Sequence, residues 1–529
     1  MRNTGAVATI AVLGLLAAAC GSSSSGGGGG VDAGNAVFSF AVSADPGALD
    51  PAMAITGETR ATVYMAYDTL VSTDPAGKTV SGLAEKWDVT PDAVTFTLRG
   101  DVTCSDGSKL TASDVAANYN RIADPATKSP LNGVLVPAGM KATADDAAGT
   151  VTLSMPEPYS FILENARDVF IVCGKGLKEP ALLAKQTFGT GPYVLAETVS
   201  GDSYTFTKRK GYTWGPGGAT TDDPAHPGKV VVRVVQKEQT AANLLISGGL
   251  SMALFSGTDR ARLEANPAIT KKVLPYVNGD IMFNQGKGKL GADLALRKAL
   301  MQAVNLDEVA SLASLKTGRT PTGMTMKPSP CTADSVAGNR PVFDAAAADA
   351  ALTAAGWARG GDGIRAKDGA KLTLNFLYTD QLGPGAQVGA EYIADAWRKL
   401  GVDIKLTGAP STKFYETLNT TGDWDVTWSS LGVTLPSQLV ALYSGKGAPD
   451  GANFAHLANE EYVELTGKAM KLTGEQACAL WTQAETSLIK NLDVLPVVET
   501  TNLVASKDAT AELYSGSVLP HSIRMTTGK

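Results

Sequence analysis

The hydrophobic period of this chain switches repeatedly between two residues and about 3.6 residues, and this switching most constrains its fold. Val94, Phe96 and Leu98 alternate with threonines, which is typical of a strand with one buried face. A capping-box pattern follows from Thr111 to Asp114 and predicts the first turn of a helix. Strands and helices that alternate along a chain predict a mixed α/β protein.

The same alternation recurs later in the chain. Ile393, Trp397 and Leu400 lie at helical spacing on one face. Gly401 is expected to end that helix in a left-handed conformation, and a strand-like run follows at 402–406. Further strand-like or helical segments are expected at 230–235, 294–305 and 345–355. Because 529 residues exceed what one hydrophobic core usually organises, at least two lobes are expected.

Composition and motifs argue against several classes of protein. The formal net charge is -6, from 46 basic and 52 acidic residues, and no long basic run occurs, so a nucleic-acid binder is not expected. The sequence has 3 histidines and no nucleophile-elbow, zinc-protease or P-loop motif, so we predict no catalytic residue, metal or cofactor. The glycine-rich run 286–291 fits a dinucleotide-binding pattern, but it does not directly follow a strand, and we interpret it as a loop.

The N-terminus has the pattern of an export signal. Residues 6–19 form an apolar run that is too short to span a bilayer, which needs about 20 residues. Three alanines then precede Cys20, which resembles a bacterial lipobox and predicts a lipoprotein signal peptide at 1–20 with Cys20 as the lipidated residue. The Gly/Ser-rich stretch 21–34 is expected to act as a flexible tether. The alternative is that Cys20 only ends a secretory signal that is cut nearby.

Several segments, in a shared order, resemble one family, the peptide/nickel-type (family 5) solute-binding proteins of ABC importers. The longest, 83–121, contains a strand, an Asp-Gly turn and a Thr-Ala-x-Asp-Val helix start, as the family does. The others are Leu49 to Pro51, Tyr67 to Val71, Gly189 to Tyr193, Arg297 to Leu300, Ala354 to Trp357, Asn453 to Ala455 and Leu495 to Val497. Together they extend over nearly the whole chain that follows the tether.

The resemblance implies a two-lobed, periplasmic-binding-protein-like (type II) α/β fold with an extra subdomain in the first lobe. The expected boundaries are 35–280 for the first lobe, with its subdomain at about 58–188, then 281–496 for the second lobe and 497–529 for a return to the first. The lobes are expected to close over a small polar solute, by default an oligopeptide. The closed monomer is then expected to dock on ABC permease subunits at the extracytoplasmic face of the cell membrane.

Four cysteines follow Cys20, and they are Cys104, Cys173, Cys331 and Cys478. None has the C-x-x-C spacing of zinc or redox sites, and an exported protein meets an oxidising environment. Four cysteines allow three disulfide connectivities. We favour Cys104–Cys173 with Cys331–Cys478, since each pair then lies within one expected lobe.

The stretch 424–436 resembles the second-lobe strand of the family that runs into a ligand-contacting loop. Its candidate ligand contacts are Trp428, Ser429, Ser430, Leu431 and Thr434. Core packing is the alternative for Trp428. In peptide receptors of the family an aspartate in this loop pairs with the α-ammonium of the peptide, whereas no acid occurs here from 429 to 436. Because a buried, unpaired ammonium is costly, a non-peptide solute is nearly as well supported as a peptide.

Other candidate ligand contacts lie in segments that border the cleft in the family. They are Asp45, Tyr64, Asn284, Gln285 and Arg297. Tyr64 is equally compatible with a core position, and Arg297 with an internal ion pair. Two functions of other classes remain as alternatives, a secreted or cell-surface enzyme and a surface adhesin or sensor of the same fold. A receptor is distinguished from an enzyme by thermal stabilisation with one solute and no turnover.

Overall fold

The structure is a computed structural model, and it describes residues 32–54, 56–74, 77–379, 382–383 and 385–527. For residues 276–278, 411–412 and 430–431 only the backbone is described. The expected signal peptide, most of the expected tether and Cys20 therefore lie outside the described residues. Among the helices that are described, none combines the length and the apolar character needed to cross a bilayer.

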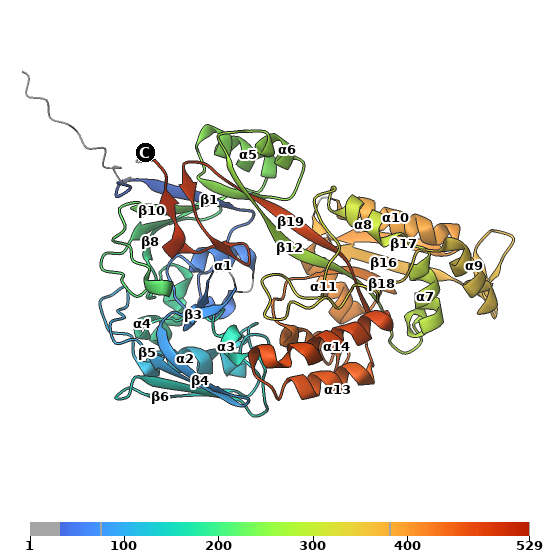
Figure 1. Cartoon of the computed structure of the whole chain (residues 1–529), viewed down its shortest axis with the longest axis horizontal. Coiled ribbons are helices and arrows are strands. Elements are labelled where there is room, and N and C mark those ends of the chain that lie inside the picture. Colours follow the sequence, from blue (N-terminus) through green and yellow to red (C-terminus); the bar gives the residue numbers. More distant parts are fainter. Residues whose placement is uncertain (1–31, 55, 75–76, 380–381, 384, 528–529) are drawn as a thin grey trace, which may run out of the picture.

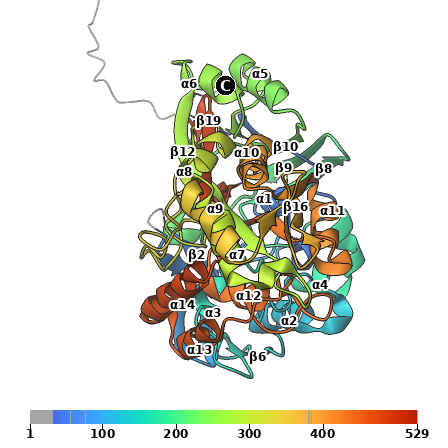
Figure 2. The same cartoon turned by 90° about the vertical axis from the view of Figure 1, so that its right-hand side faces the viewer.

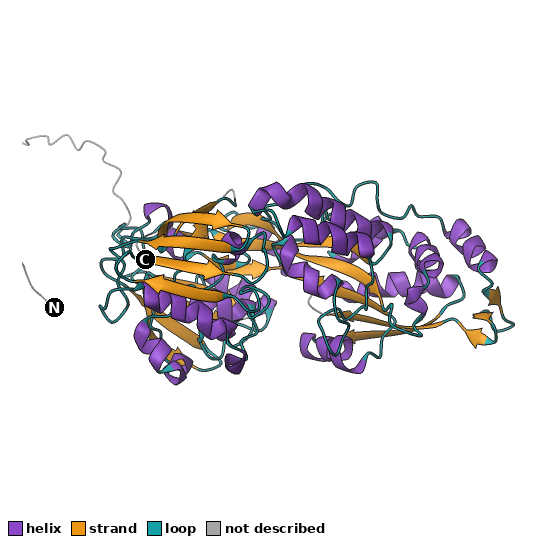
Figure 3. Cartoon of the chain, turned by 90° about the horizontal axis from the view of Figure 1, so that it is seen from below, coloured by secondary structure: helices purple, strands orange, loops and turns teal. Residues whose placement is uncertain are grey.

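One sheet of ten strands runs through both lobes, which lie side by side along the long axis of the molecule (Figures 1 and 3). The long strands β12 (Thr270–Phe283) and β19 (Val494–Ser506) pair antiparallel at its centre and cross from one lobe to the other. Their register shifts between Pro275 and Asn278 and again between Gly279 and Asp280. The remaining strands are β17 (Asp403–Ala409), β16 (Thr373–Thr379) and β18 (Val426–Leu431) on the side of β12, and β11 (Met252–Phe255), β1 (Val37–Val42), β10 (Lys229–Val234), β9 (Ser203–Lys208) and β8 (Tyr193–Val199) on the side of β19.

The first lobe contains the half of the sheet from β11 to β8. Strand β1 pairs in parallel with both β10 and β11, and alternate residues such as Phe38, Val230 and Val232 are buried. Its helices include α1 (Gly57–Val63), α5 (Glu238–Ser247) and α6 (Asp259–Glu264). The extra subdomain lies at the lower left of Figure 1 and has its own antiparallel sheet of β4 (Ala84–Thr90), β5 (Ala93–Leu98), β7 (Thr150–Ser154) and β6 (Lys141–Asp145), with α2 (Ala112–Ala123).

The second lobe is built on parallel β17, β16 and β18, and helices pack against its sheet. Trp397 of α10 (Ala386–Lys399) packs between Phe283 and Phe376, and its indole N–H donates to the Leu300 carbonyl at 2.8 Å. The other long helices are α7 (Leu294–Gln302), α8 (Leu306–Ala313), α9 (Ala345–Ala354), α13 (Glu460–Ala469) and α14 (Cys478–Lys490). Helices α13 and α14 pack together at the same end of the molecule as the subdomain (Figure 2).

The elements predicted from hydrophobic period and capping are confirmed where the structure describes them. The predicted strand around Phe96 is β5, and Thr111 and Asp114 form both hydrogen bonds of the capping box at the start of α2. Gly401 ends α10 at φ 87°, a conformation that favours glycine because it has no Cβ. Strand β17 follows directly.

Two disulfide bonds are present in the structure, and they have the favoured connectivity, Cys104–Cys173 and Cys331–Cys478. The main hydrophobic core of the second lobe is formed by buried residues between Ile281 and Val498. Three further cores draw on residues 33–274 and 503–525. This division follows the lobes expected from the sequence, whose boundary residues stay a prediction.

Candidate functional site

The two lobes touch where the subdomain meets the hairpin of α13 and α14. The Ser160 hydroxyl lies 2.5 Å from the Ala469 carbonyl, and the Gly474 N–H donates to the Ser160 carbonyl at 2.8 Å. The rings of Phe161 and Trp481 lie 6.1 Å apart, in a small apolar cluster that contains residues of both lobes. In Figures 1 and 2, α3 (Ile162–Asn165) accordingly lies beside α14. The lobes are therefore closed on one another at this end.

A second set of contacts between the lobes involves the loop after β18. The Gln438 amide donates to Asn165 at 3.3 Å, and Thr434 lies close enough to the Tyr514 hydroxyl to lower the pKa of Tyr514. Thr434 is a residue that the sequence places in the ligand-contacting loop, and it is buried. This loop thus lies against the first lobe and the subdomain, as a loop that closes over a solute must.

Next to these contacts the first lobe buries a group of charged and aromatic side chains, which we call the interlobe cluster. Its members are Arg60, Tyr64, Arg167, Asp168 and Tyr514. Arg60 and Asp168 form an ion pair at 2.5 Å, and the Tyr514 hydroxyl lies 3.5 Å from the second Asp168 oxygen. Burial is the largest single influence on the pKa of Arg60 and lowers it, but Asp168, Tyr64 and Tyr514 together raise this pKa by more, so the guanidinium stays charged. Burial, then the charge of Asp168, raises the pKa of Tyr64, which keeps this phenol neutral.

Tyr64 also shows how aromatic rings enclose the interlobe cluster. Its ring meets that of Phe170 edge to face at 4.6 Å, and the Arg60 guanidinium lies 5.3 Å from the centre of the same Phe170 ring. The sequence left open whether Tyr64 is a core residue or a wall of the solute site. The structure buries it and places it beside the charged groups, so we retain it as a candidate wall.

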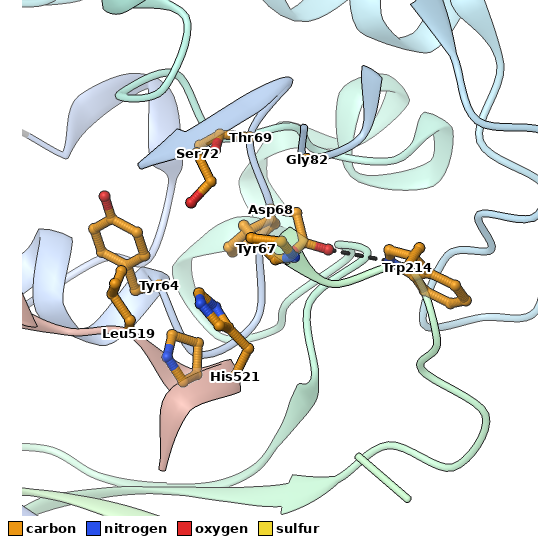
Figure 4. A pocket seen from close by; sticks show the side chains of 11 residues that line it. Tyr64, Tyr67, Asp68, Thr69, Ser72, Gly82, Trp214, Leu519 and His521 are labelled. Atoms are coloured by element: carbon orange, nitrogen blue, oxygen red, sulfur yellow. Dashed lines mark hydrogen bonds between the residues drawn. The ribbon is translucent and has the colours of Figure 1, made fainter. Parts of the chain in front are cut away.

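A small cavity lies on the other side of Tyr64, within the first lobe (Figure 4). It is lined by Tyr64, Tyr67, Asp68, Thr69, Ser72, Gly82, Trp214, Pro216, Leu519, Pro520 and His521. Its volume is about 20 Å³, which suffices for one ordered water but not for a solute. The Asp68 carboxylate accepts hydrogen bonds from Thr190, Tyr212 and Trp214 at 2.9–3.2 Å, and burial raises its pKa. We interpret this cavity as structural.

A larger groove of about 320 Å³ lies at the carboxyl ends of the parallel strands β1, β10 and β11. Its volume is within the range of small-molecule sites, and the carboxyl ends of parallel strands are a frequent place for them. Polar groups on its wall come from Ser43, Glu58, Gln236, Glu238, Asn502 and Ser517. Helix α1 lies between this groove and the interlobe cluster, because Glu58 and Ala61 line the groove while Arg60 faces Asp168.

Two residues expected to contact solute, Gln285 and Arg297, are instead held by Asp493. Arg297 and Asp493 form a buried ion pair at 3.2 Å, and Arg297 also donates to the carbonyls of Gly291 and Asn491. Gln285 donates to the same Asp493 carboxylate at 2.8 Å. Arg297 therefore follows the alternative interpretation, an internal ion pair.

Asn284 is likewise held within the second lobe. Its amide donates to the Trp424 carbonyl at 3.2 Å and accepts from the Gly286 N–H at 3.0 Å. Because the side-chain amides of Asn284 and Gln285 and both terminal nitrogens of Arg297 form hydrogen bonds within the second lobe, we do not carry these three residues into the proposed site.

Asp45 lies on the exposed surface of the first lobe, away from the contacts between lobes. Its carboxylate accepts a hydrogen bond from the Tyr204 hydroxyl and others from the N–H groups of Gly47 and Gly201, at 2.8 and 2.6 Å. These hydrogen bonds, that of Tyr204 first, lower the pKa of Asp45. The structure thus gives Asp45 a role in holding the loop after β1.

The strand β18 places the remaining candidates at different depths. Trp428 and Ser429 are fully buried, and the Ser429 hydroxyl donates to the Asp280 carbonyl at 3.4 Å. Ser430 and Leu431 continue the strand and pair with Gly279 and Asn278, and their side chains are not described. Thr434 remains the residue of this group with a contact across the lobes.

The sequence reasoning missed several buried charged residues, among them Arg167 and Asp280. Arg167 and its neighbour Asp168 are adjacent charges between the apolar residues 161–163 and 169–172, and charged side chains are seldom fully buried unless they are paired. Asp280 is an acid beside the apolar residues 281–283 in a strand that crosses between the lobes. In both places the signal was a charge at a position that the surrounding pattern marks as buried.

Two lobes joined by crossing strands, closed on each other and burying charged groups where they meet, define a solute receptor of the periplasmic-binding type. Residues 78–453 match the model of the bacterial extracellular solute-binding proteins, family 5 Middle, and the chain belongs to this family. It is accordingly a solute-binding protein of an ABC importer that acts outside the cytoplasm. The predicted fold class and function are confirmed.

Curated relatives match most of the chain. Protein XP55 of Streptomyces lividans is 28% identical over 437 residues, which cover 80% of this chain and 76% of the relative. The periplasmic murein peptide-binding protein MppA of Escherichia coli is 24% identical over 507 residues, covering 87% and 86%. A substrate-binding protein from Microbacterium hydrocarbonoxydans, solved in complex with 4-hydroxybenzoate hydrazide, has a TM-score of 0.73 at 25% identity and covers 93% of this chain and 100% of its own.

Proposed function

We propose that this chain is a membrane-tethered monomer that encloses a small polar solute between its lobes and delivers it to an ABC permease. The observation that carries the proposal is the interlobe cluster, a set of buried charges where two lobes meet around a loop of the second. Burying a charge is unfavourable unless it is paired, and in this cluster Arg60 and Asp168 form an ion pair whereas Arg167 forms none with a described residue. The excess buried charge at this boundary needs a functional reason. Enclosing a polar solute supplies that reason.

Two observations bear on the class of solute, namely what similar proteins bind and the composition of the loop after β18. MppA is named for murein peptides, and the Microbacterium protein was solved with a hydrazide of an aromatic acid, so peptides and small non-peptide solutes both occur among similar proteins. The absence of an acid from 429 to 436 removes the partner that a peptide α-ammonium would use in this loop. We propose no catalytic activity for this chain.

Uptake by cells tests this function. A strain that lacks this chain is expected to leave in its growth medium at least one peptide or small polar solute that the parent removes, because the permease depends on its receptor. Comparative mass spectrometry of spent media measures this difference. Re-expression of the full chain should restore removal of the same solute. Identical spent media from parent and deletion strain would count against the proposal.

The membrane tether follows from the sequence around Cys20. We propose that Cys20 carries a lipid and that residues 21–34 hold the folded lobes away from the bilayer. A Cys20→Ala variant is then expected to appear in the medium or the soluble fraction, whereas the wild type fractionates with membranes and incorporates labelled palmitate. Cys331→Ala is a suitable control, since it changes a cysteine of the folded body and should leave membrane fractionation unchanged. Equal membrane fractionation of wild type and Cys20→Ala would reject the tether.

A further inference from the structure

Phe161 of the subdomain is buried by the second lobe rather than by its own. The residues that follow it along the chain, Ile162, Ala166 and Val169, pack into the core of the subdomain. Phe161 itself has no exposed surface, and the other buried members of its apolar cluster come from the second lobe; they are Cys331, Leu435, Ala469, Ala477 and Trp481. The Phe161 ring therefore loses this burial when the lobes separate.

The residue before Phe161 binds the end of a helix in the opposite lobe. Helix α13 ends at Ala469, and the last carbonyls of a helix have no partner within it. The Ser160 hydroxyl lies 2.5 Å from the Ala469 carbonyl and 2.8 Å from the Leu472 carbonyl, and it donates to this pair. In the other direction, the Gly474 N–H donates to the Ser160 carbonyl at 2.8 Å. We call Ser160 and Phe161 the subdomain latch.

The subdomain latch lies far from the strands that connect the lobes. In Figures 1 and 2, β12 and β19 cross in the upper part of the molecule, whereas α3, which directly follows the latch, meets α14 in the lower part. When two lobes rotate about the strands that join them, the points farthest from those strands move most. A small opening rotation is therefore enough to break the contacts of the latch.

We propose that the subdomain latch holds the lobes together through protein contacts alone, and that it thereby sets how tightly the receptor retains a solute without selecting among solutes. This inference rests on the proposed receptor function and gives the extra subdomain a role in it. The chain supplies every donor and acceptor of the latch, so its contribution to closure is the same for each enclosed solute. Since a solute that binds the closed state gains affinity in proportion to the closed fraction, Ser160 and Phe161 act as positioning residues.

Hydrogen exchange of the full-length chain, stripped of solute, tests the latch directly. The Ser160 carbonyl protects the Gly474 N–H, so exchange in a peptide that contains Gly474, followed by mass spectrometry, reports opening of the lobes. Phe161→Ala should speed this exchange by about 10- to 100-fold, because the closed state loses a buried aromatic ring. Ser160→Ala removes a single hydroxyl and should speed it by about 2- to 10-fold.

Two further variants and one further peptide separate this role from a structural one. Phe161→Leu keeps an apolar side chain and should speed the exchange of Gly474 less than Phe161→Ala does. Phe343→Ala removes a half-exposed ring of the second lobe outside the latch and should leave the exchange unchanged. Unchanged exchange of Gly474 in Phe161→Ala would overturn the inference. An equal gain of exchange in β5 would do so too, because Phe161 would then hold the subdomain itself together.

The effect on solute is measured on the chain purified from its own cell envelope. During dialysis, Phe161→Ala should lose each solute found with the wild type about 10-fold or more faster, with the order of retention among solutes unchanged. A changed order would show that Phe161 selects among solutes and would reject its positioning role. A wild type that carries no solute would reject the receptor function, and the exchange of Gly474 would still decide whether the latch holds the lobes.

Discussion

Asp280→Asn is expected to stabilise the chain at pH 7 to 8 and to flatten its dependence of stability on pH. Asp280 is fully buried in β12, and neither of its carboxylate oxygens has a hydrogen-bond partner in the described chain. Burial, and then the charge of Glu485, raise the pKa of this carboxyl from 3.8 to about 8. The folded state therefore holds the proton more tightly than the unfolded state does.

The sign of the pH dependence follows from linkage. A group whose pKa is raised by folding contributes its stability fully below about pH 4 and loses it progressively up to about pH 8. At pH 7 the lost stability amounts to about 4 kcal/mol, since each unit of pKa corresponds to about 1.4 kcal/mol. Asparagine has the same shape and no charge, so the variant avoids this loss.

Thermal unfolding of the wild type and of Asp280→Asn at pH 5, 7 and 8 measures this effect. The variant should exceed the wild type at pH 8 and converge with it toward pH 5. A part of the pH dependence should remain, because burial also raises the pKa of Glu485. Asp45→Asn is the control, since hydrogen bonds lower the pKa of Asp45 and its stability contribution is lost on acidification instead. Parallel pH profiles for Asp280→Asn and the wild type would show that Asp280 is solvated or paired in solution.

Trp428→Ala is expected to destabilise the second lobe by about 3–5 kcal/mol, the usual result of removing a fully buried tryptophan. Trp428 has no exposed surface and lies in β18 between Ile281 of β12 and Tyr378 of β16. Gly279 and Gly389 make room for its indole, because a Cβ on either would lie 2.6–2.7 Å from the ring. Alanine would leave a large cavity in this core.

The unfolding temperature of the second lobe measures this prediction, and Trp87→Ala provides the comparison. Trp87 lies on β4 of the subdomain and is only partly buried, so its loss should lower stability by much less. Trp428→Phe should recover a large part of the loss. A melting temperature of Trp428→Ala within experimental error of the wild type would contradict the core position of the indole.

The elements of the fold could be predicted because their signals are local. The alternation around Phe96, the capping box at Thr111 and the glycine stop at Gly401 each depend on neighbours within a few residues. The two lobes were predicted from the order of the short segments that resemble the family, because no local pattern indicates them. The crossing strands β12 and β19 lie more than 200 residues apart in the chain, so their pairing had to come from the resemblance.

The site was less predictable because partners decide it, and partners are distant in sequence. Arg297 is a solute ligand or an ion-pair residue depending on Asp493, which lies 196 residues away. The sequence predicts Trp428 to lie beside the ligand-contacting loop. In the fold it is buried, and glycines on two other elements make room for its indole. Arg167 was overlooked, because the sequence around an arginine does not show whether its Nε and Nη2 have hydrogen-bond partners in the fold. Charges in apolar segments are the signal that sequence reasoning should have weighed more heavily.

Native mass spectrometry of the chain purified from its own cell envelope tests the receptor function most directly. We predict a mass increase that corresponds to one small polar solute per chain, lost on mild unfolding and chemically unchanged after prolonged incubation with the protein. A chain that carries no solute and binds none from the growth medium, or one that converts the added solute into a product, would contradict the account of a receptor that closes two lobes over its cargo.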